Sequence, residues 1–239
     1  MVYQWINNVQ KLFTPCCIIC HQDSDNPYIL CSRCASELPC QGHTCIHCGN
    51  VIPAQRISEQ PQLVCGQCLQ HPPNFDSAFI PFRYSKPFNQ FIPALKFQQK
   101  LQYGRLMSSL FIEQFQQLHR KPALKPQCII PVPLHPKRLR QRGFNQSLEI
   151  SRGIARQLDI PLDISSIKRI KNTQAQSDLD KSKRQSNMHN AFEISKSINY
   201  QHVALFDDVM TTGYTFNELS RVLKQSGVTT IEIWAIARA

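Results

Sequence analysis

Paired cysteines constrain the first third of the chain more than any other feature. Ten of the eleven cysteines precede residue 69, and eight of them form four Cys-x-x-Cys pairs. Two such pairs, separated by about 10–20 residues, have the spacing of a structural zinc site, because each pair offers two thiolates to one tetrahedral ion. The pattern predicts one or two zinc ions in this segment. The pairs are Cys17/Cys20, Cys31/Cys34, Cys45/Cys48 and Cys65/Cys68.

The order of the pairs suggests which cysteines share an ion. The first two pairs would form one site and the last two another, while a cross-braced arrangement is equally compatible with the spacing. The same cysteines could also form a redox array, an iron–sulfur site or a site that has lost its metal. A shell of four thiolates leaves no open position for catalysis, so we assign zinc a structural role. Cys16 competes with Cys17 in the first pair. Further candidates to substitute as ligands are Cys40, His21, His43, His47 and His71, although for each histidine a solvated loop position is favoured.

Composition narrows the class of protein. The chain has 239 residues, 42% of them apolar, which allows one or two domains with a real core. Its net charge of +11 favours an anionic partner such as nucleic acid or a phosphorylated metabolite. The N-terminus lacks a secretory signal pattern and no apolar run could span a bilayer. We therefore expect a cytoplasmic protein, in which the thiols stay reduced.

The remaining chain alternates apolar strands with amphipathic helices. Pro72 and Pro73 mark the boundary between an N-terminal module (residues 1–71), with its N-terminal helix and double zinc ribbon, and a second domain (residues 72–239). The alternation predicts an α/β fold with a doubly wound parallel sheet in the second domain. We expect helices over residues 101–118, 148–158 and 215–226, and strands at QCIIPVP (127–133), HVALF (202–206) and IEIWAIA (231–237).

One segment near the C-terminus, FDDVMTTGYT (206–215), combines two carboxylates with a glycine turn. In doubly wound sheets, ligands bind at the carboxyl ends of the strands, where Asp207 and Asp208 are expected. Gly213 lets the backbone approach a ligand, and the N–H groups at the start of the following helix favour an anion. Because carboxylates would repel a phosphate, we expect them to face sugar hydroxyls. The alternative is that both are ordinary turn and cap residues.

VALFDDVMTTGYT (203–215) resembles the phosphoribosyl-pyrophosphate motif of type I phosphoribosyltransferases. The resemblance implies that Asp207 and Asp208 contact the ribose hydroxyls, where in an active enzyme they would stabilise the reacting sugar. It also implies that a second set of residues surrounds the 5′-phosphate. These are Met210, Thr211, Thr212, Gly213, Tyr214 and Thr215.

The match extends over nearly the whole chain. PVPLHPKRLRQRGFNQS (131–147), the segment KNTQAQSDLDKSKRQSNMHNAF (171–192) and the cysteine pairs together resemble the competence protein F family. That family resemblance implies a cytosolic protein that handles incoming single-stranded DNA during natural transformation or DNA utilisation. A DNA-processing protein would be a further partner.

Two loops would complete the site. The loop after Pro133, with Leu134 and His135, would bind pyrophosphate in a transferase, and Arg138 and Arg142 follow it. The alternative for these arginines is a solvated basic face. The polar segment 171–190 corresponds to the lid of transferases, although an ordinary mobile loop would have the same composition. Between residues 75 and 97 lie many aromatic residues, for which buried packing is favoured over base stacking.

The sequence leaves three functions open. The first is a competence protein that holds single-stranded DNA and has a phosphoribosyl-pyrophosphate-type site. An active transferase would instead move ribose 5-phosphate to an unknown acceptor with magnesium and release pyrophosphate, without binding DNA directly. A nucleotide sensor would bind the sugar phosphate and regulate a DNA-handling partner. No acceptor pocket is evident in the sequence, so catalysis is a separate question from binding.

Overall fold

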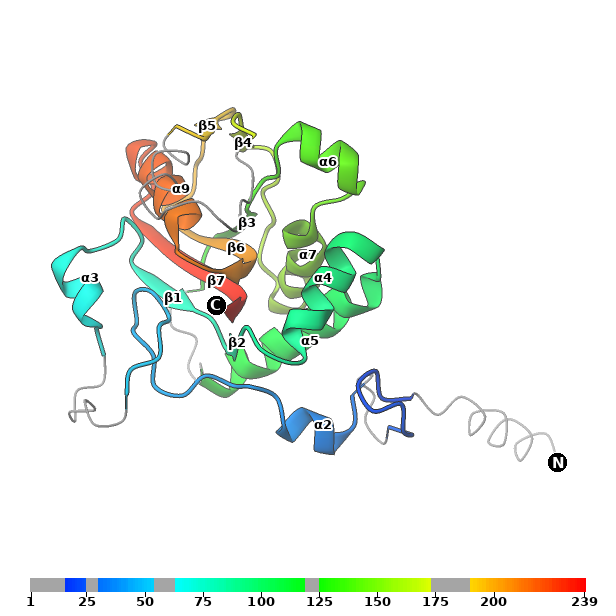
Figure 1. Ribbon diagram of the computed structural model, residues 1–239. Coiled ribbons are helices and arrows are strands. Elements are labelled where there is room, and N and C mark those ends of the chain that lie inside the picture. Colours follow the sequence, from blue (N-terminus) through cyan, green and yellow to red (C-terminus); the bar gives the residue numbers. More distant parts are fainter. Residues whose placement is uncertain (1–15, 25–29, 54–62, 119–124, 173–189) are drawn as a thin grey trace. The chain divides into compact units, whose positions relative to one another are not determined.

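The computed structural model describes residues 16–24, 30–53, 63–118, 125–172 and 190–239 (Figure 1). The chain forms two compact units, Met1–Pro39 and Cys40–Ala239. Within the described residues, no helix is both long and apolar enough to cross a membrane. The predicted N-terminal helix and most of the predicted lid lie outside these residues.

The first unit is built around two short turns that carry cysteines. The chain from Cys16 to Asp23 closes on itself, with a bridge between those two residues and a bond from the Cys17 N–H to the Gln22 carbonyl (2.7 Å). The second turn is helix α2 (Ser32–Ser36), which begins directly after Cys31. Each Cys-x-x-Cys pair of this unit therefore lies on one tight turn.

A parallel sheet forms the centre of the second unit. Its strands follow the order β1-β7-β6-β3, and β2 pairs with the end of β7. β4 and β5 form a separate antiparallel pair. The strands are β1 (Ser77–Phe79), β2 (Phe82–Arg83), β3 (Cys128–Pro131), β4 (Ile167–Arg169), β5 (Phe192–Ile194), β6 (His202–Met210) and β7 (Thr230–Arg238).

Helices cover both faces of this sheet, as the prediction of a doubly wound fold requires (Figure 1). On one face, Phe111 packs edge-to-face on Phe206 and near Trp234. On the other face, Phe216 and Leu219 are buried with the remaining inward side chains of β6 and β7. The helices of this unit are α3 (Gly66–Gln70), α4 (Phe88–Gln98), α5 (Leu101–Leu118), α6 (Pro136–Arg142), α7 (Gln146–Leu158) and α9 (Tyr214–Gln225).

The three predicted helices and three predicted strands are confirmed, with shifted ends. Strand β6 continues to Met210, because its backbone pairs with β7 as far as Arg238. The acid pair therefore lies among the last residues of a hydrogen-bonded strand rather than in a loop. This pairing fixes the backbone of both carboxylates, which a flexible loop would not do.

The aromatic segment packs mainly within the protein. Phe82 stacks on Phe88 (4.4 Å between ring centres), and Phe91 stacks on Tyr103 (4.6 Å). Phe79 contacts two rings of α5 edge-to-face. Phe97 is the main exception among the described rings of this segment, with 71% of its surface exposed. Burial, which the sequence favours over base stacking, thus accounts for most of these residues.

The second half of the cysteine-rich segment packs against the sheet. Cys45, Cys48 and Cys68 are buried in the same core as β6 and β7. The Ala78 N–H in β1 donates to the Ile46 carbonyl (2.7 Å). The predicted domain boundary between residues 71 and 72 stays a prediction, and these contacts show that the two segments share a core.

Candidate functional site

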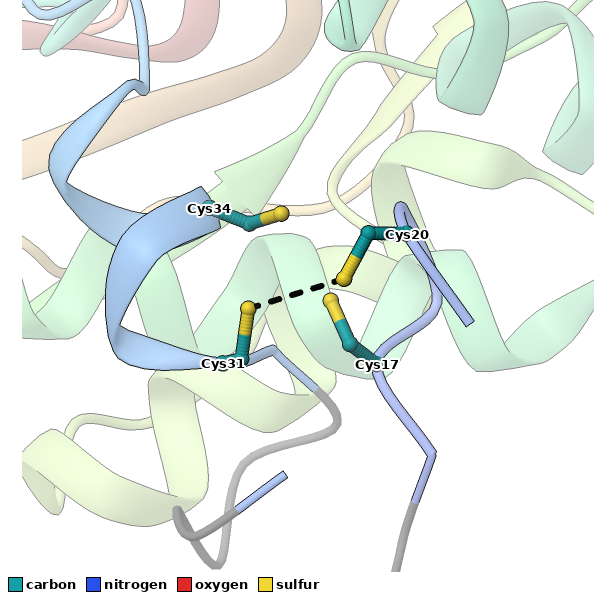
Figure 2. Close-up of side chains that lie close together, drawn as sticks. All are labelled: Cys17, Cys20, Cys31 and Cys34. Atoms are coloured by element: carbon teal, nitrogen blue, oxygen red, sulfur yellow. Dashed lines mark hydrogen bonds between the residues drawn. The ribbon is translucent and has the colours of Figure 1, made fainter. Parts of the chain in front are cut away.

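The first group of cysteines has the geometry of a metal site. The sulfur atoms of Cys17, Cys20, Cys31 and Cys34 lie within 4.8 Å of one another and point toward a common centre (Figure 2). A tetrahedral zinc–thiolate site with Zn–S bonds of about 2.3 Å places its sulfurs about 3.8 Å apart. Cys20 Sγ and Cys31 Sγ are 3.7 Å apart. The four side chains therefore fit a zinc ion.

The second group of four cysteines satisfies the same test. Cys45, Cys48, Cys65 and Cys68 bring their sulfurs within 4.8 Å of one another, and Cys48 Sγ lies 3.6 Å from Cys65 Sγ. The Cys48 thiol and the Cys65 N–H, which donates to Cys45 Sγ (3.3 Å), lower the pKa of Cys45 to about 4. Zinc binds the thiolate form, so this environment prepares a ligand. The sulfur atoms group in the sequential arrangement and not in the cross-braced one, while zinc binding itself stays a prediction.

The acid pair lies near the end of β6 and has a polar partner on each side. Ser147 Oγ, from the first turn of α7, donates to Asp207 Oδ1 (2.5 Å). Asp208 Oδ2 forms an ion pair with Lys96 Nζ of α4 (2.5 Å). Asp208 is only 3% exposed, so this pair is shielded from water. Helices α4 and α7 thus each place one polar side chain against the two adjacent carboxylates of β6.

The pKa values of the two carboxylates are shifted in opposite directions. Burial and the negative charge of Asp208 raise the pKa of Asp207 to about 7. Burial acts on Asp208 in the same direction, but the Lys96 ammonium outweighs it and holds the pKa of Asp208 below its ordinary value. Near neutral pH the pair therefore carries between one and two negative charges. Asp208 is the more acidic member of the pair.

The turn after the acid pair ends at the N-terminus of α9. Gly213 has a φ of 79°, and a Cβ at that position would lie 2.7 Å from Met210 Cε. Thr211 and Thr212 are exposed, and Tyr214 and Thr215 begin the helix. No side chain caps α9, so its first N–H groups face the turn, as an anion site requires. Met210 itself is buried, so its side chain does not reach the turn surface.

Arg238, at the end of β7, ties this turn to the second cysteine group. Its guanidinium donates to the carbonyls of Met210 (2.9 Å) and Thr211, while its Nε donates to the Cys48 carbonyl (3.1 Å). One side chain thus fixes the backbone on both sides. The metal site and the predicted phosphate turn are parts of one structure.

Three arginines lie near the acid pair. Arg142 donates to Gln146 Oε1 (3.0 Å) and lies over the Phe97 ring, 5.4 Å from its centre. Burial and the charge of Arg142 lower the pKa of Arg138. Burial and the charge of Arg138 lower the pKa of Arg169 to about 10, against the opposing effect of Asp207. These shifts place the three guanidinium groups within electrostatic reach of one another, and Arg169 within reach of Asp207.

A cavity of about 640 Å³ opens beside the loop that follows β3. Leu134 and His135 line it, and the His135 side chain also caps α6 by accepting from the Lys137 N–H (3.2 Å). The Asn145 amide donates to the Val132 carbonyl (3.0 Å), which fixes this loop against α7. The loop is therefore positioned at the carboxyl end of β3, beside β6.

Comparison with known proteins agrees with this geometry. The model of the phosphoribosyl transferase domain matches residues 145–239. Competence protein F of Haemophilus influenzae is 37% identical over 214 residues, which cover 88% of this chain and 90% of that protein. The chain belongs to the competence protein F family. DNA utilization protein YhgH of Salmonella typhimurium is 31% identical, and that of Escherichia coli K12 is 30% identical, each over 87% of this chain and 90% of the relative.

Sequence reasoning identified the acid pair and the turn of this family member, but it missed several partners. Lys96, Ser147, Arg169 and Arg238 come from four separate elements and were not among the candidates. Ser147 ends the motif PVPLHPKRLRQRGFNQS, which was a signal for a polar residue at the site. The roles of the predicted ligand-binding residues stay predictions.

Proposed function

We propose that this protein handles single-stranded DNA in natural transformation or DNA utilisation and binds phosphoribosyl pyrophosphate, or a similar sugar phosphate, at the end of β6. The names of its relatives, a competence protein and DNA utilization proteins, support the first part. The phosphoribosyl transferase domain supports the second. We place the protein in the cytoplasm, with a structural zinc ion in each group of four cysteines.

One observation carries the sugar-phosphate proposal. The acid pair is followed after a short turn by an uncapped helix N-terminus, and Arg169 of β4, within electrostatic reach of Asp207, is grouped with Arg138 and Arg142 of α6. Carboxylates suit ribose hydroxyls as hydrogen-bond acceptors, whereas backbone N–H groups suit a 5′-phosphate. Arginines suit a pyrophosphate group. A ligand with ribose hydroxyls, a 5′-phosphate and a pyrophosphate group therefore matches the acid pair, the helix N-terminus and the arginines in turn.

A DNA surface is favoured by a different set of residues. Lys137 and Arg140 lie on the exposed side of α6, away from the buried acid pair. Exposed cations bind a nucleic acid backbone through release of counterions, without reading its sequence. The proposal therefore assigns DNA to the outer face of α6 and the sugar phosphate to the carboxyl end of the sheet.

Transfer of the ribose is the second candidate function. It would break the bond between ribose C1 and pyrophosphate, form a bond from C1 to a nucleophilic acceptor and release pyrophosphate. Asp207 and Asp208 together would stabilise positive charge that develops on the sugar, and the arginines would stabilise the leaving group. The cavity beside β3 supplies space for an acceptor near the pyrophosphate loop.

A crossed experiment separates these functions. Calorimetry with phosphoribosyl pyrophosphate is compared with single-stranded DNA binding, for the double variants Asp207→Asn/Asp208→Asn and Lys137→Ala/Arg140→Ala. We expect the first to lose sugar-phosphate binding alone. The second should weaken DNA binding and lower its logarithmic salt slope by about 1.4. The exposed Asp159→Asn is the matched control.

Two results would contradict the proposal. Sugar-phosphate binding that survives loss of both carboxylates would exclude the site at β6. DNA binding that does not depend on salt would exclude a backbone contact. Release of pyrophosphate in the presence of a nucleobase or other acceptor would establish the transferase, and binding without release would leave a binding protein or sensor.

A further inference from the structure

Magnesium, the predicted companion of the sugar phosphate, does not fit the acid pair as the structure arranges it. Two of the four carboxylate oxygens already have close partners: Asp208 Oδ2 has Lys96, and Asp207 Oδ1 accepts from Ser147 and from the Asp208 N–H (2.9 Å). Magnesium requires near-octahedral oxygen ligands and bound water. The ammonium group 2.5 Å from Asp208 Oδ2 takes one of the oxygens that such an ion would use and places a positive charge beside the pair, which disfavours a second cation there.

We propose that the Lys96 ammonium takes the place of a divalent cation beside the acid pair, so that this site binds its phosphorylated ribose without metal. Lys96 is then a ligand-positioning residue: it neutralises Asp208 and presents its remaining N–H groups to the bound anion. This inference rests on the proposed sugar-phosphate function and concerns how that site achieves charge balance.

The Lys96–Asp208 contact is a built feature of the fold rather than a surface pair. The Lys96 side chain is 21% exposed and that of Asp208 is 4% exposed. Helix α4 is fixed by the buried side chains of Phe91, Ile92 and Leu95, so Lys96 enters the site from a rigid element. Burial lowers the pKa of Lys96, but Asp208 and Asp207 outweigh it and raise the pKa, so the ammonium stays charged.

The chain also places its own cations within electrostatic reach of the pair. Lys96 contacts Asp208, and Asp207 acts on the pKa of Arg169 against burial and the charge of Arg138. Metal-dependent sites supply positive charge beside a phosphate by binding an ion with it. At this pair we assign that part to Lys96.

Calorimetry of the zinc-loaded protein with phosphoribosyl pyrophosphate, in buffer freed of divalent cations by a chelating resin before the protein is added and in the same buffer with magnesium, tests the inference. No soluble chelator is present, and zinc content is measured after each titration, because a chelator would remove the structural zinc as well. Wild-type affinity should differ by less than about threefold between the two conditions. Lys96→Met, which keeps the aliphatic stem, should lose about tenfold to hundredfold without magnesium and recover with it. Lys96→Arg should remain independent of metal, and the exposed Lys100→Met should behave as the wild type. A wild-type loss of more than about tenfold without magnesium, at unchanged zinc content, would overturn the inference.

A second measurement uses Mn²⁺ alone and does not depend on the sugar phosphate. Electron paramagnetic resonance should detect no Mn²⁺ site in the wild type and a new site in Lys96→Met, which disappears when Asp208→Asn is added. Zinc content and circular dichroism establish that each variant is folded. Mn²⁺ bound to the wild type and released by Asp208→Asn would refute the inference. Failure to bind phosphoribosyl pyrophosphate in both conditions would instead refute the proposed function, with the Mn²⁺ result still deciding the role of Lys96.

Discussion

Asp207→Asn should stabilise the protein at alkaline pH while weakening its sugar-phosphate site. The wild-type carboxyl has a folded-state pKa of about 7, compared with about 3.9 in an unfolded chain. Below pH 4 both states are protonated and the group has no effect. Between about pH 4 and 7 the folded state alone holds the proton, so the free energy of unfolding falls as the pH rises, and it levels off above pH 7.

The size of this effect follows from the pKa difference. About three pKa units correspond to about 4 kcal/mol at pH 8, an upper value because Asp207 and Asp208 titrate together. Asparagine does not ionise, and its Oδ1 can still accept from Ser147 and the Asp208 N–H. We expect Asp207→Asn to gain about 2–4 kcal/mol at pH 8 and almost nothing at pH 4.

Urea unfolding of the zinc-loaded protein at pH 4.5 and pH 8, compared between wild type and variant, measures this difference. Asp163→Asn is a control of opposite sign. Burial raises the pKa of Asp163, but hydrogen bonds from Ser165 and Ser166 outweigh it and lower the pKa, so this variant should lose stability mainly above pH 4. If Asp207→Asn changes stability equally at both pH values, the electrostatic account of the acid pair is wrong.

Two further predictions concern the backbone around the site. Gly213→Ala places a Cβ at a φ of 79° and 2.7 Å from Met210 Cε, so it should destabilise the protein by about 1–3 kcal/mol and abolish sugar-phosphate binding; thermal melting and calorimetry measure the two effects. Cys20→Ser and Cys48→Ser should each remove one zinc ion per chain. Only Cys48→Ser should also lower the melting temperature of the sheet and weaken sugar-phosphate binding. The reason is that Cys48 is buried in the core of the sheet and its carbonyl accepts from Arg238. Equal melting curves for the two cysteine variants would show that the second site is independent of the sheet.

Features that depend on neighbouring residues were predicted from the sequence. The parallel sheet follows from apolar strands that alternate with helices, and each cysteine turn follows from one four-residue spacing. The acid pair and the glycine turn lie in one ten-residue segment, so their proximity required no knowledge of packing. The extra length of β6 was missed, because its pairing with β7 continues through polar residues that are not typical of a buried strand.

The partners of the acid pair depend on packing between distant segments, but Lys96 did leave a signal in the sequence. It follows the buried Ile92 by four residues, one helical turn away, within a helix whose buried side chains are all apolar. A lysine in such a position loses hydration, which costs several kcal/mol unless a buried acid compensates. The chain contains one adjacent pair of acidic residues, and it lies near the end of the buried strand β6. A lysine among the apolar residues of one helix and two acids at the end of one strand therefore indicate an ion pair between them, because a buried cation or a buried acid pair is unstable without an opposite charge.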